Sequence, residues 1–153
     1  MKQLRKGSEI SKPFPKIVMC FGTFDLLHLG HLYYLKQAKK QGDCLVVVVA
    51  RDKTKQLQKK LTVFSEKERL ELIQSLRWVD KAVLGHLKDH FKIIQEINPL
   101  VICLGYDHPI SETKLKEKLA RLGLKPKIIR ISSYKPNQQK SSLLKELILK
   151  HNF

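Results

Sequence analysis

The chain has 153 residues, which suits one compact domain, and 42% of them are hydrophobic, which is enough for a substantial core. The 30 Lys and Arg residues outnumber the 14 Asp and Glu residues, and the resulting charge of +16 attracts nucleic acid, anionic membrane surfaces or phosphorylated small molecules. No apolar run is as long as a membrane-spanning helix, and the basic N-terminus lacks the apolar core of a signal peptide, so a cytoplasmic protein is expected.

Residues 1–16 are polar and basic and contain two prolines, so we interpret them as a basic N-terminal extension. In the domain predicted to follow, 17–150, short apolar runs alternate with helical periodicity. The apolar runs are the predicted strands 17–21, 44–50, 82–84, 100–104 and 127–131. The helical patterns cover 30–41, 65–76, 88–97, 111–122 and 141–150. This alternation predicts a single α/β domain with a doubly wound, five-stranded parallel sheet of the Rossmann-like kind.

The loop after the first predicted strand carries the residues best suited to chemistry. Ligands of doubly wound sheets bind beyond the carboxyl ends of the strands, where the strand order reverses. His28 and His31 share one face of a helix start, and Gly30 between them lets a ligand approach the backbone. Free N–H groups and the helix dipole favour an anion there. We therefore predict a phosphate cradle, with the two histidines aimed into it, formed by Gly22, Thr23, Phe24, Asp25 and Gly30.

The paired histidines suit the transfer of a nucleoside monophosphate. That reaction passes through a crowded, charged phosphorus centre, so positioning and charge neutralisation supply most of its rate. His28 and His31 can donate hydrogen bonds to the α-phosphate, and no general base is needed if the nucleophile is an ionised phosphate. Mg²⁺ or another divalent metal is expected to bind through triphosphate oxygens and water rather than protein side chains. The alternative, that the histidines are metal ligands or polar surface residues, lacks an obvious third ligand.

The string GTFDLLHLGH at 22–31 resembles the HxGH signature of the cytidylyltransferase-like nucleotidyltransferase superfamily. The basic loop after the second strand also matches its pattern, through Arg51, Asp52 and Lys60. The resemblance implies that Lys60 is a catalytic residue that reaches the triphosphate, and that Arg51, Asp52 and Arg69 lie near the acceptor or the phosphates. The alternative is that the lysines of this loop are solvated charges and that Arg69 pairs with Glu66 or Glu68.

Two later segments match the superfamily as well. Gly105, Tyr106 and Asp107 follow the fourth predicted strand, where the family holds the nucleoside. Ser141 and Ser142 open the last helix, where a Ser/Thr-rich motif of the family binds the β- and γ-phosphates. A helix-capping role for Ser141 is an equal and compatible interpretation.

The whole span 17–150 resembles the archaeal-type FAD synthases, most clearly at VVVARDKTK (47–55), LGYD (104–107) and KSSLLKELI (140–148). This resemblance implies transfer of AMP from ATP to FMN, with FAD and pyrophosphate as products, and a homodimer. The nearest alternative is a CTP-dependent cytidylyltransferase that acts on glycerol 3-phosphate or a related polyol phosphate. A basic nucleic-acid-binding module is the alternative from another class, but its stacking platforms need more aromatic residues than the 7% present here.

Overall fold

The computed structural model describes residues 14–151, so positions 1–13 of the predicted extension lie outside the described residues. Strands and helices alternate as predicted, except that two helices instead of one separate the second and third strands. Their order is β1 (Ile17–Gly22), α1 (Leu29–Lys39), β2 (Cys44–Val49), α2 (Asp52–Leu57), α3 (Glu66–Gln74), β3 (Lys81–Leu84), α4 (Lys92–Ile97), β4 (Val101–Leu104), α5 (Glu112–Arg121), β5 (Lys127–Arg130) and α6 (Ser141–Lys150). Within this part of the chain, no helix is long and apolar enough to cross a membrane.

The described strands form one parallel sheet of five, in the order β3-β2-β1-β4-β5, which confirms the predicted doubly wound architecture. The order reverses between β1 and β4, which pair directly through Val18, Met19 and Cys20. The loops after β1 and β4 therefore leave the same edge of the sheet side by side, where this class of fold binds ligands.

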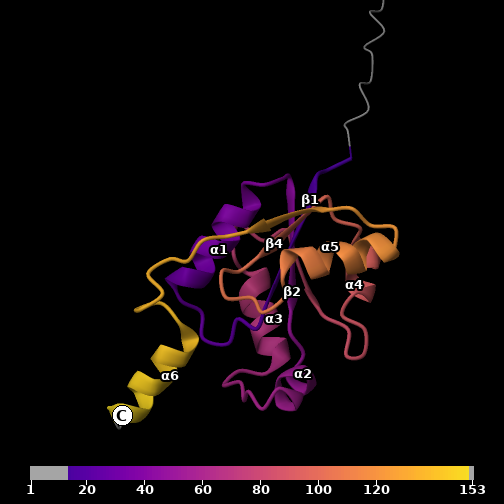
Figure 1. Cartoon of the computed structure of the whole chain (residues 1–153). Coiled ribbons are helices and arrows are strands. Elements are labelled where there is room, and N and C mark those ends of the chain that lie inside the picture. The colour runs from indigo at the N-terminus through magenta and orange to yellow at the C-terminus, as the bar shows by residue number, and fades with distance from the viewer. Residues whose placement is uncertain (1–13, 152–153) are drawn as a thin grey trace, which may run out of the picture.

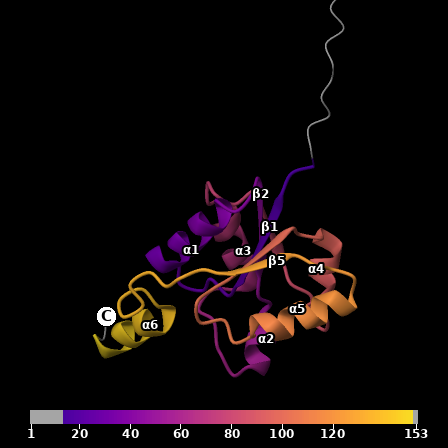
Figure 2. The ribbon, with the colours of Figure 1, turned by 45° about the horizontal axis from the view of Figure 1, so that its top comes forward.

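Helices cover both faces of the sheet (Figure 2). The strand alternation directs Val18 and Cys20 into one core cluster, with Leu35 of α1 and Ile73 of α3, whereas Met19 faces the other. The second cluster packs on the side chains that α4 and α5 contribute, which are Ile93, Ile94, Leu115 and Leu119. Two buried layers of this kind fix the strand ends and hence the loops that carry the predicted site.

Two helices differ from the layers around the sheet. No sequence pattern predicted α2, which forms within the segment predicted to be a basic loop and has no buried residue. The carboxylate of Glu66 holds its start, because it accepts from the N–H of Asp52 and from Arg51. The last helix, α6, is described in full and also has no buried residue; it lies at the edge of the molecule (Figure 1).

Candidate active site

The two histidines of the HxGH signature stack on each other at the start of α1. Their ring centroids are 3.9 Å apart with 26° between the planes. His28 is the N-cap of α1, and its Nδ1 accepts a hydrogen bond of 3.1 Å from the N–H of Gly30. Because Nδ1 is an acceptor, the proton of the neutral ring lies on Nε2. His28 thus carries its N–H donor on Nε2, the ring nitrogen that the N–H of Gly30 does not occupy.

Both imidazoles are neutral at physiological pH. Burial lowers the pKa of His28, and burial together with the neighbouring His28 lowers the pKa of His31 to about 3. The Nδ1 of His31 is buried and has no hydrogen-bond partner among the described residues. A buried nitrogen without a partner costs about 1–3 kcal/mol, and such costs concentrate at functional sites. The pair is therefore suited to donating hydrogen bonds rather than to carrying charge before substrate binds.

The depressed pKa of His31 predicts a loss of stability in mild acid. The unfolded chain binds a proton on His31 as the pH falls below about 6.5, whereas the folded protein keeps this ring neutral down to about pH 3. The free energy of unfolding should therefore fall by about 1–2 kcal/mol more in the wild type than in His31→Gln between about pH 7.5 and pH 5. Urea titrations at the two pH values measure this difference. Equal losses in both proteins would contradict the buried, neutral state of His31.

The glycines and Phe24 of this loop serve packing. Phe24 is 2% exposed, adopts a left-handed backbone (φ 53°) and packs edge-to-face with His31, with 5.3 Å between the ring centroids. A Cβ on Gly22 would lie 2.5 Å from the Phe24 ring, so Gly22 makes room for this side chain. The close approach at Gly30 is to the His28 ring and the carbonyl of Gln139, at 2.8 and 3.1 Å from a Cβ placed there.

The N–H groups at the start of α1 have partners within the chain. The N–H of Gly30 donates to His28, and the N–H of Leu29 donates to the side-chain oxygen of Gln139 at 3.2 Å. An amide oxygen thus stands where the sequence predicted an anion. The local pattern contained no signal for this contact, because Gln139 lies 110 residues along the chain from Leu29.

Asp25 connects the loop before α3 and helix α6 to the signature. It is 4% exposed and accepts from the N–H groups of Val63 and Phe64 at 2.9 Å, and its other oxygen lies 2.6 Å from Lys145 of α6. Burial alone would raise its pKa, but the bonds from Lys145 and the two N–H groups outweigh burial and lower the pKa. These contacts use both carboxylate oxygens. In the structure Asp25 therefore positions the loop before α3 and helix α6, whereas the sequence predicted a contact with the nucleotide.

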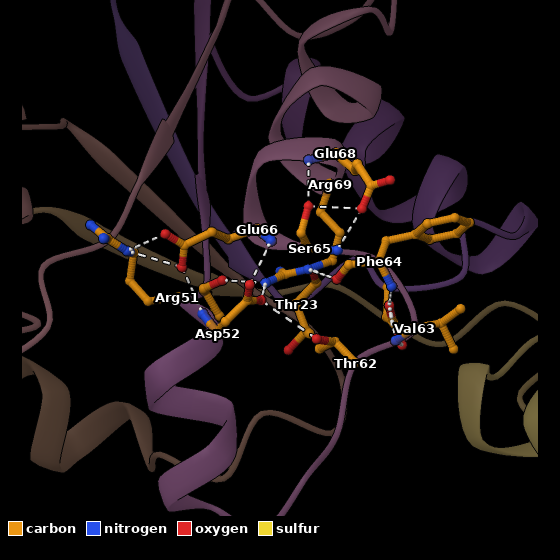
Figure 3. Close-up of polar contacts among 12 residues, drawn as sticks. Thr23, Arg51, Asp52, Thr62, Val63, Phe64, Ser65, Glu66, Glu68 and Arg69 are labelled. Atoms are coloured by element: carbon orange, nitrogen blue, oxygen red, sulfur yellow. Dashed lines mark hydrogen bonds and ion pairs between the residues drawn. The ribbon is translucent and has the colours of Figure 1, made fainter.

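The placement of Arg69 differs from its predicted place beside the acceptor or the phosphates. Its side chain is fully buried (0% exposed), so it has no surface with which to touch a ligand. The guanidinium donates to the carbonyls of Thr23 (2.6 Å), Ala50 (2.8 Å) and Phe64 (3.1 Å) and to the carboxylate of Asp52 (2.7 Å) (Figure 3). It pairs with neither Glu66 nor Glu68, the partners that the alternative interpretation named. Arg69 instead ties together the loops that follow β1 and β2 and the loop before α3.

Asp52 and Arg51 belong to the same network. Asp52 accepts from Arg69, from the N–H of Glu66 at 2.9 Å and from the hydroxyl of Thr62 at 3.4 Å (Figure 3). Arg51 pairs with Glu66 at 3.0 Å and keeps 31% of its side chain exposed. Of the residues predicted near the acceptor or the phosphates, Arg51 is the one that still offers an exposed cation.

Lys60 lines a cavity of about 220 Å³ together with Gln56, Leu61 and Thr62. Lys55 stands nearby: burial, and then the charges of Lys60, Arg69 and Lys145, lower its pKa. This mutual repulsion marks a cluster of cations that a polyanion would relieve. That Lys55 and Lys145 belong to this cluster was not predicted from the sequence. Lys145 lies one helical turn after Ser141 and therefore on the same face of the helix, so its place there was a usable signal.

The remaining predicted residues lie around this centre. The hydroxyl of Ser141 donates to the carbonyl of Leu26 at 3.3 Å, and the N-cap of α6 is Lys140, so Ser141 attaches α6 to the HxGH loop instead of capping it. Ser142 is exposed, and its side chain forms no hydrogen bond within residues 14–151. Gly105, Tyr106 and Asp107 follow β4, the strand beside β1.

The similarity of this chain to known proteins agrees with this geometry. A family model described as cytidylyltransferase-like matches residues 19–147, which include the histidine pair and Ser141. The chain belongs to the cytidylyltransferase-like family. Among its relatives in this family is the FAD synthase of Thermoplasma acidophilum, which is 46% identical over 132 residues, 86% of this chain and 93% of the relative. The FAD synthase of Thermoplasma volcanium is 48% identical over the same shares of the two chains.

One solved structure has the same fold. It is described as the lipopolysaccharide core biosynthesis protein from Thermoplasma volcanium GSS1. It is 50% identical to this chain, superposes with a TM-score of 0.78, and the match covers 79% of this chain and 99% of that one. The nucleotidyltransferase fold and family predicted from the sequence are thereby confirmed.

Proposed function

We propose that this chain is an FAD synthase that transfers AMP from ATP to the phosphate of FMN and releases pyrophosphate. The observation that carries the chemistry is the stacked, neutral pair His28 and His31 at the start of α1. The choice of substrates is supported by the relatives of 46% and 48% identity that bear the name FAD synthase.

In this reaction an ionised oxygen of the FMN phosphate attacks the α-phosphorus of ATP. A new P–O bond forms, the bond to the bridging oxygen breaks, and pyrophosphate leaves with the electron pair. The Nε2–H of His28 donates to an α-phosphate oxygen as negative charge moves through the phosphorus centre. Lys60 and the helix start at Ser141 and Ser142 hold the β- and γ-phosphates. No proton has to leave the nucleophile, so no carboxylate base is needed.

A divalent cation such as Mg²⁺ fits this site as a companion of the triphosphate. Within residues 14–151, no group of three or more His, Cys, Asp or Glu side chains could hold a metal ion by itself. The oxygens of Asp25 and Asp52 already accept hydrogen bonds from the chain. Mg²⁺ binds readily through phosphate oxygens and water, and when bound it would neutralise charge on the triphosphate.

Apolar side chains near Lys60 favour a flavin over a polyol phosphate as the acceptor. Leu57, Leu61 and Val63 are 77%, 81% and 62% exposed, although burying a side chain of this size is worth about 1.5–3 kcal/mol. The ring system of FMN would cover such a surface, whereas glycerol 3-phosphate needs hydroxyl partners. Leu61 also lines the cavity that Lys60 borders, so apolar and cationic groups meet at one place, as a molecule with a flat ring and a phosphate requires.

A substrate matrix tests the proposal. The wild-type protein is incubated with Mg²⁺ and each pairing of ATP or CTP with FMN or glycerol 3-phosphate. We expect pyrophosphate release only with ATP and FMN, together with FAD identified by chromatography. Formation of a CDP-alcohol from CTP without any FAD would transfer the assignment to a cytidylyltransferase and leave the histidine roles standing.

A further inference from the structure

The last residue of β5, Arg130, holds the loop 105–110 that follows β4. One terminal nitrogen of its guanidinium donates to the carbonyls of Gly105 (2.9 Å) and His108 (3.1 Å), and the other donates to the carbonyl of Ile110 (2.8 Å). The strand register explains this reach, because Arg130 pairs with Leu104, the residue directly before the loop. A carboxylate oxygen of Glu112 lies 3.5 Å from Nε and orients the fork from the other side.

The loop is also braced from within. The N–H of His108 donates to the carbonyl of Gly105 at 3.2 Å, and the N–H of Ile110 donates to Nδ1 of His108 at 3.3 Å. Burial and the charge of Arg130 lower the pKa of His108 more than Asp107 raises it, which keeps this ring neutral and able to accept. Tyr106 and Asp107 face solvent at the turn of the braced loop.

We infer that Arg130 is a positioning residue for the nucleoside of ATP, an inference that rests on the proposed function. The loop 105–110 lies beyond β4, next to β1, at the point of the sheet where ligands of this fold class bind. The terminal nitrogens of Arg130 donate to carbonyls of the loop, so Arg130 affects the reaction by holding the loop in one conformation. A guanidinium is suited to this because its donors form a rigid planar fork and it stays charged at any physiological pH.

The size of the effect follows from the population of the competent loop. When the binding-competent conformation is only partly populated, the apparent dissociation constant rises by the reciprocal of its fraction. Without Arg130 the carbonyls of Gly105, His108 and Ile110 lose a charged donor, and the loop can adopt other conformations. A competent fraction of about one tenth would raise the KM for ATP about tenfold. FMN has no such dependence, since its proposed surface lies beside Lys60 after β2.

Steady-state kinetics of Arg130→Gln and Arg130→Lys test this inference, with Arg121→Ala as the matched control. Arg121 also carries a positive charge, but it is exposed at the C-terminal end of α5, away from the loop, and its side chain forms no ion pair within the described part of the chain. We expect Arg130→Gln to raise the KM for ATP at least about tenfold, with kcat and the KM for FMN changed less than about twofold. Lysine is a point charge without the planar fork of arginine, so the KM for ATP of Arg130→Lys should lie between those of the wild type and Arg130→Gln. The KM for ATP of Arg121→Ala should match that of the wild type.

Hydrogen–deuterium exchange of the loop 105–110 supplies the second measurement. We expect faster exchange in Arg130→Gln, and recovery of slow exchange with a non-hydrolysable ATP analogue at saturation. An equal rise of both KM values, or an unchanged KM for ATP in a folded Arg130→Gln, would overturn the inference. If Arg130→Gln does not fold, the same criteria apply to Arg130→Lys.

Failure of the proposed function would be recognisable separately. If the wild type forms no FAD, calorimetric titration with the non-hydrolysable ATP analogue replaces the kinetics. An affinity for the analogue that falls about tenfold in Arg130→Gln would support the positioning role without FMN. An affinity equal to that of the wild type, or no binding by either protein, would overturn it.

Discussion

Replacing His28 or His31 with Ala is expected to lower the turnover of FAD formation by about a hundredfold or more, the scale of losing one donor to a transition state. The reason is geometric. The two rings lie in contact, 3.9 Å between centroids, and the proton of the His28 ring lies on Nε2 because Nδ1 accepts from the N–H of Gly30. Removing either ring loses a donor and the stack that orients the other. Quenched-flow or steady-state measurement of pyrophosphate release gives the turnover.

The control for this experiment is another histidine of the same chain. His90 is exposed, and His90→Ala should leave both turnover and melting temperature close to the wild type. His28→Ala removes the N-cap of α1 and should cost about 1 kcal/mol of stability, and His31→Ala removes a ring that packs against Phe24, but both variants should still fold because neither ring belongs to the two core clusters. Turnover within a few fold of the wild type in both folded variants would remove the histidines from the mechanism.

The elements that follow local rules were predictable from the sequence. β2 contains a run of valines, and Ser65 opens α3 with a complete capping box, so both elements follow from residues that are neighbours along the chain. The short helix α2 did not follow, because its start depends on Glu66, which lies 14 residues beyond Asp52. Its own six residues are mostly polar, none of them is buried, and they carry no helical periodicity.

The site shows the same division. The motif placed His28 and His31 at a helix start, and the structure has them there. The partners of Arg69 and Asp25 were not predictable, because the local pattern around a charged residue is the same whether its side chain binds a ligand or the backbone of a distant loop. Only the fold brings the carbonyl of Thr23 to Arg69, across 46 residues. Burial, which the sequence does not state, decides between the two uses.

Replacing Arg69 with Met should lower the free energy of unfolding by about 3 kcal/mol or more, the range for breaking a buried charged pair. The substitution keeps most of the apolar volume but leaves the carbonyls of Thr23, Ala50 and Phe64 without their charged donor. It also removes the charged partner of Asp52. Burial alone would raise the pKa of Asp52, but the hydrogen bond from the N–H of Glu66 and then the bond and charge of Arg69 lower this pKa. Urea unfolding followed by circular dichroism measures the change.

The matched control is Arg51→Ala, which removes a cation from the same network at a partly exposed pair. Its cost should stay below that of Arg69→Met, at about 1 kcal/mol, because Arg51 keeps 31% of its side chain exposed and ion pairs that water reaches contribute little. Adding Asp52→Asn to Arg69→Met should recover part of the loss, since the amide no longer carries an unpaired charge. A different outcome would restore the role predicted from the sequence: an Arg69→Met protein as stable as the wild type, with a raised KM for FMN or ATP. That result would require the Arg69 side chain to leave its buried position and contact a substrate, and the bonds to Thr23, Ala50 and Phe64 would then belong only to the unliganded enzyme.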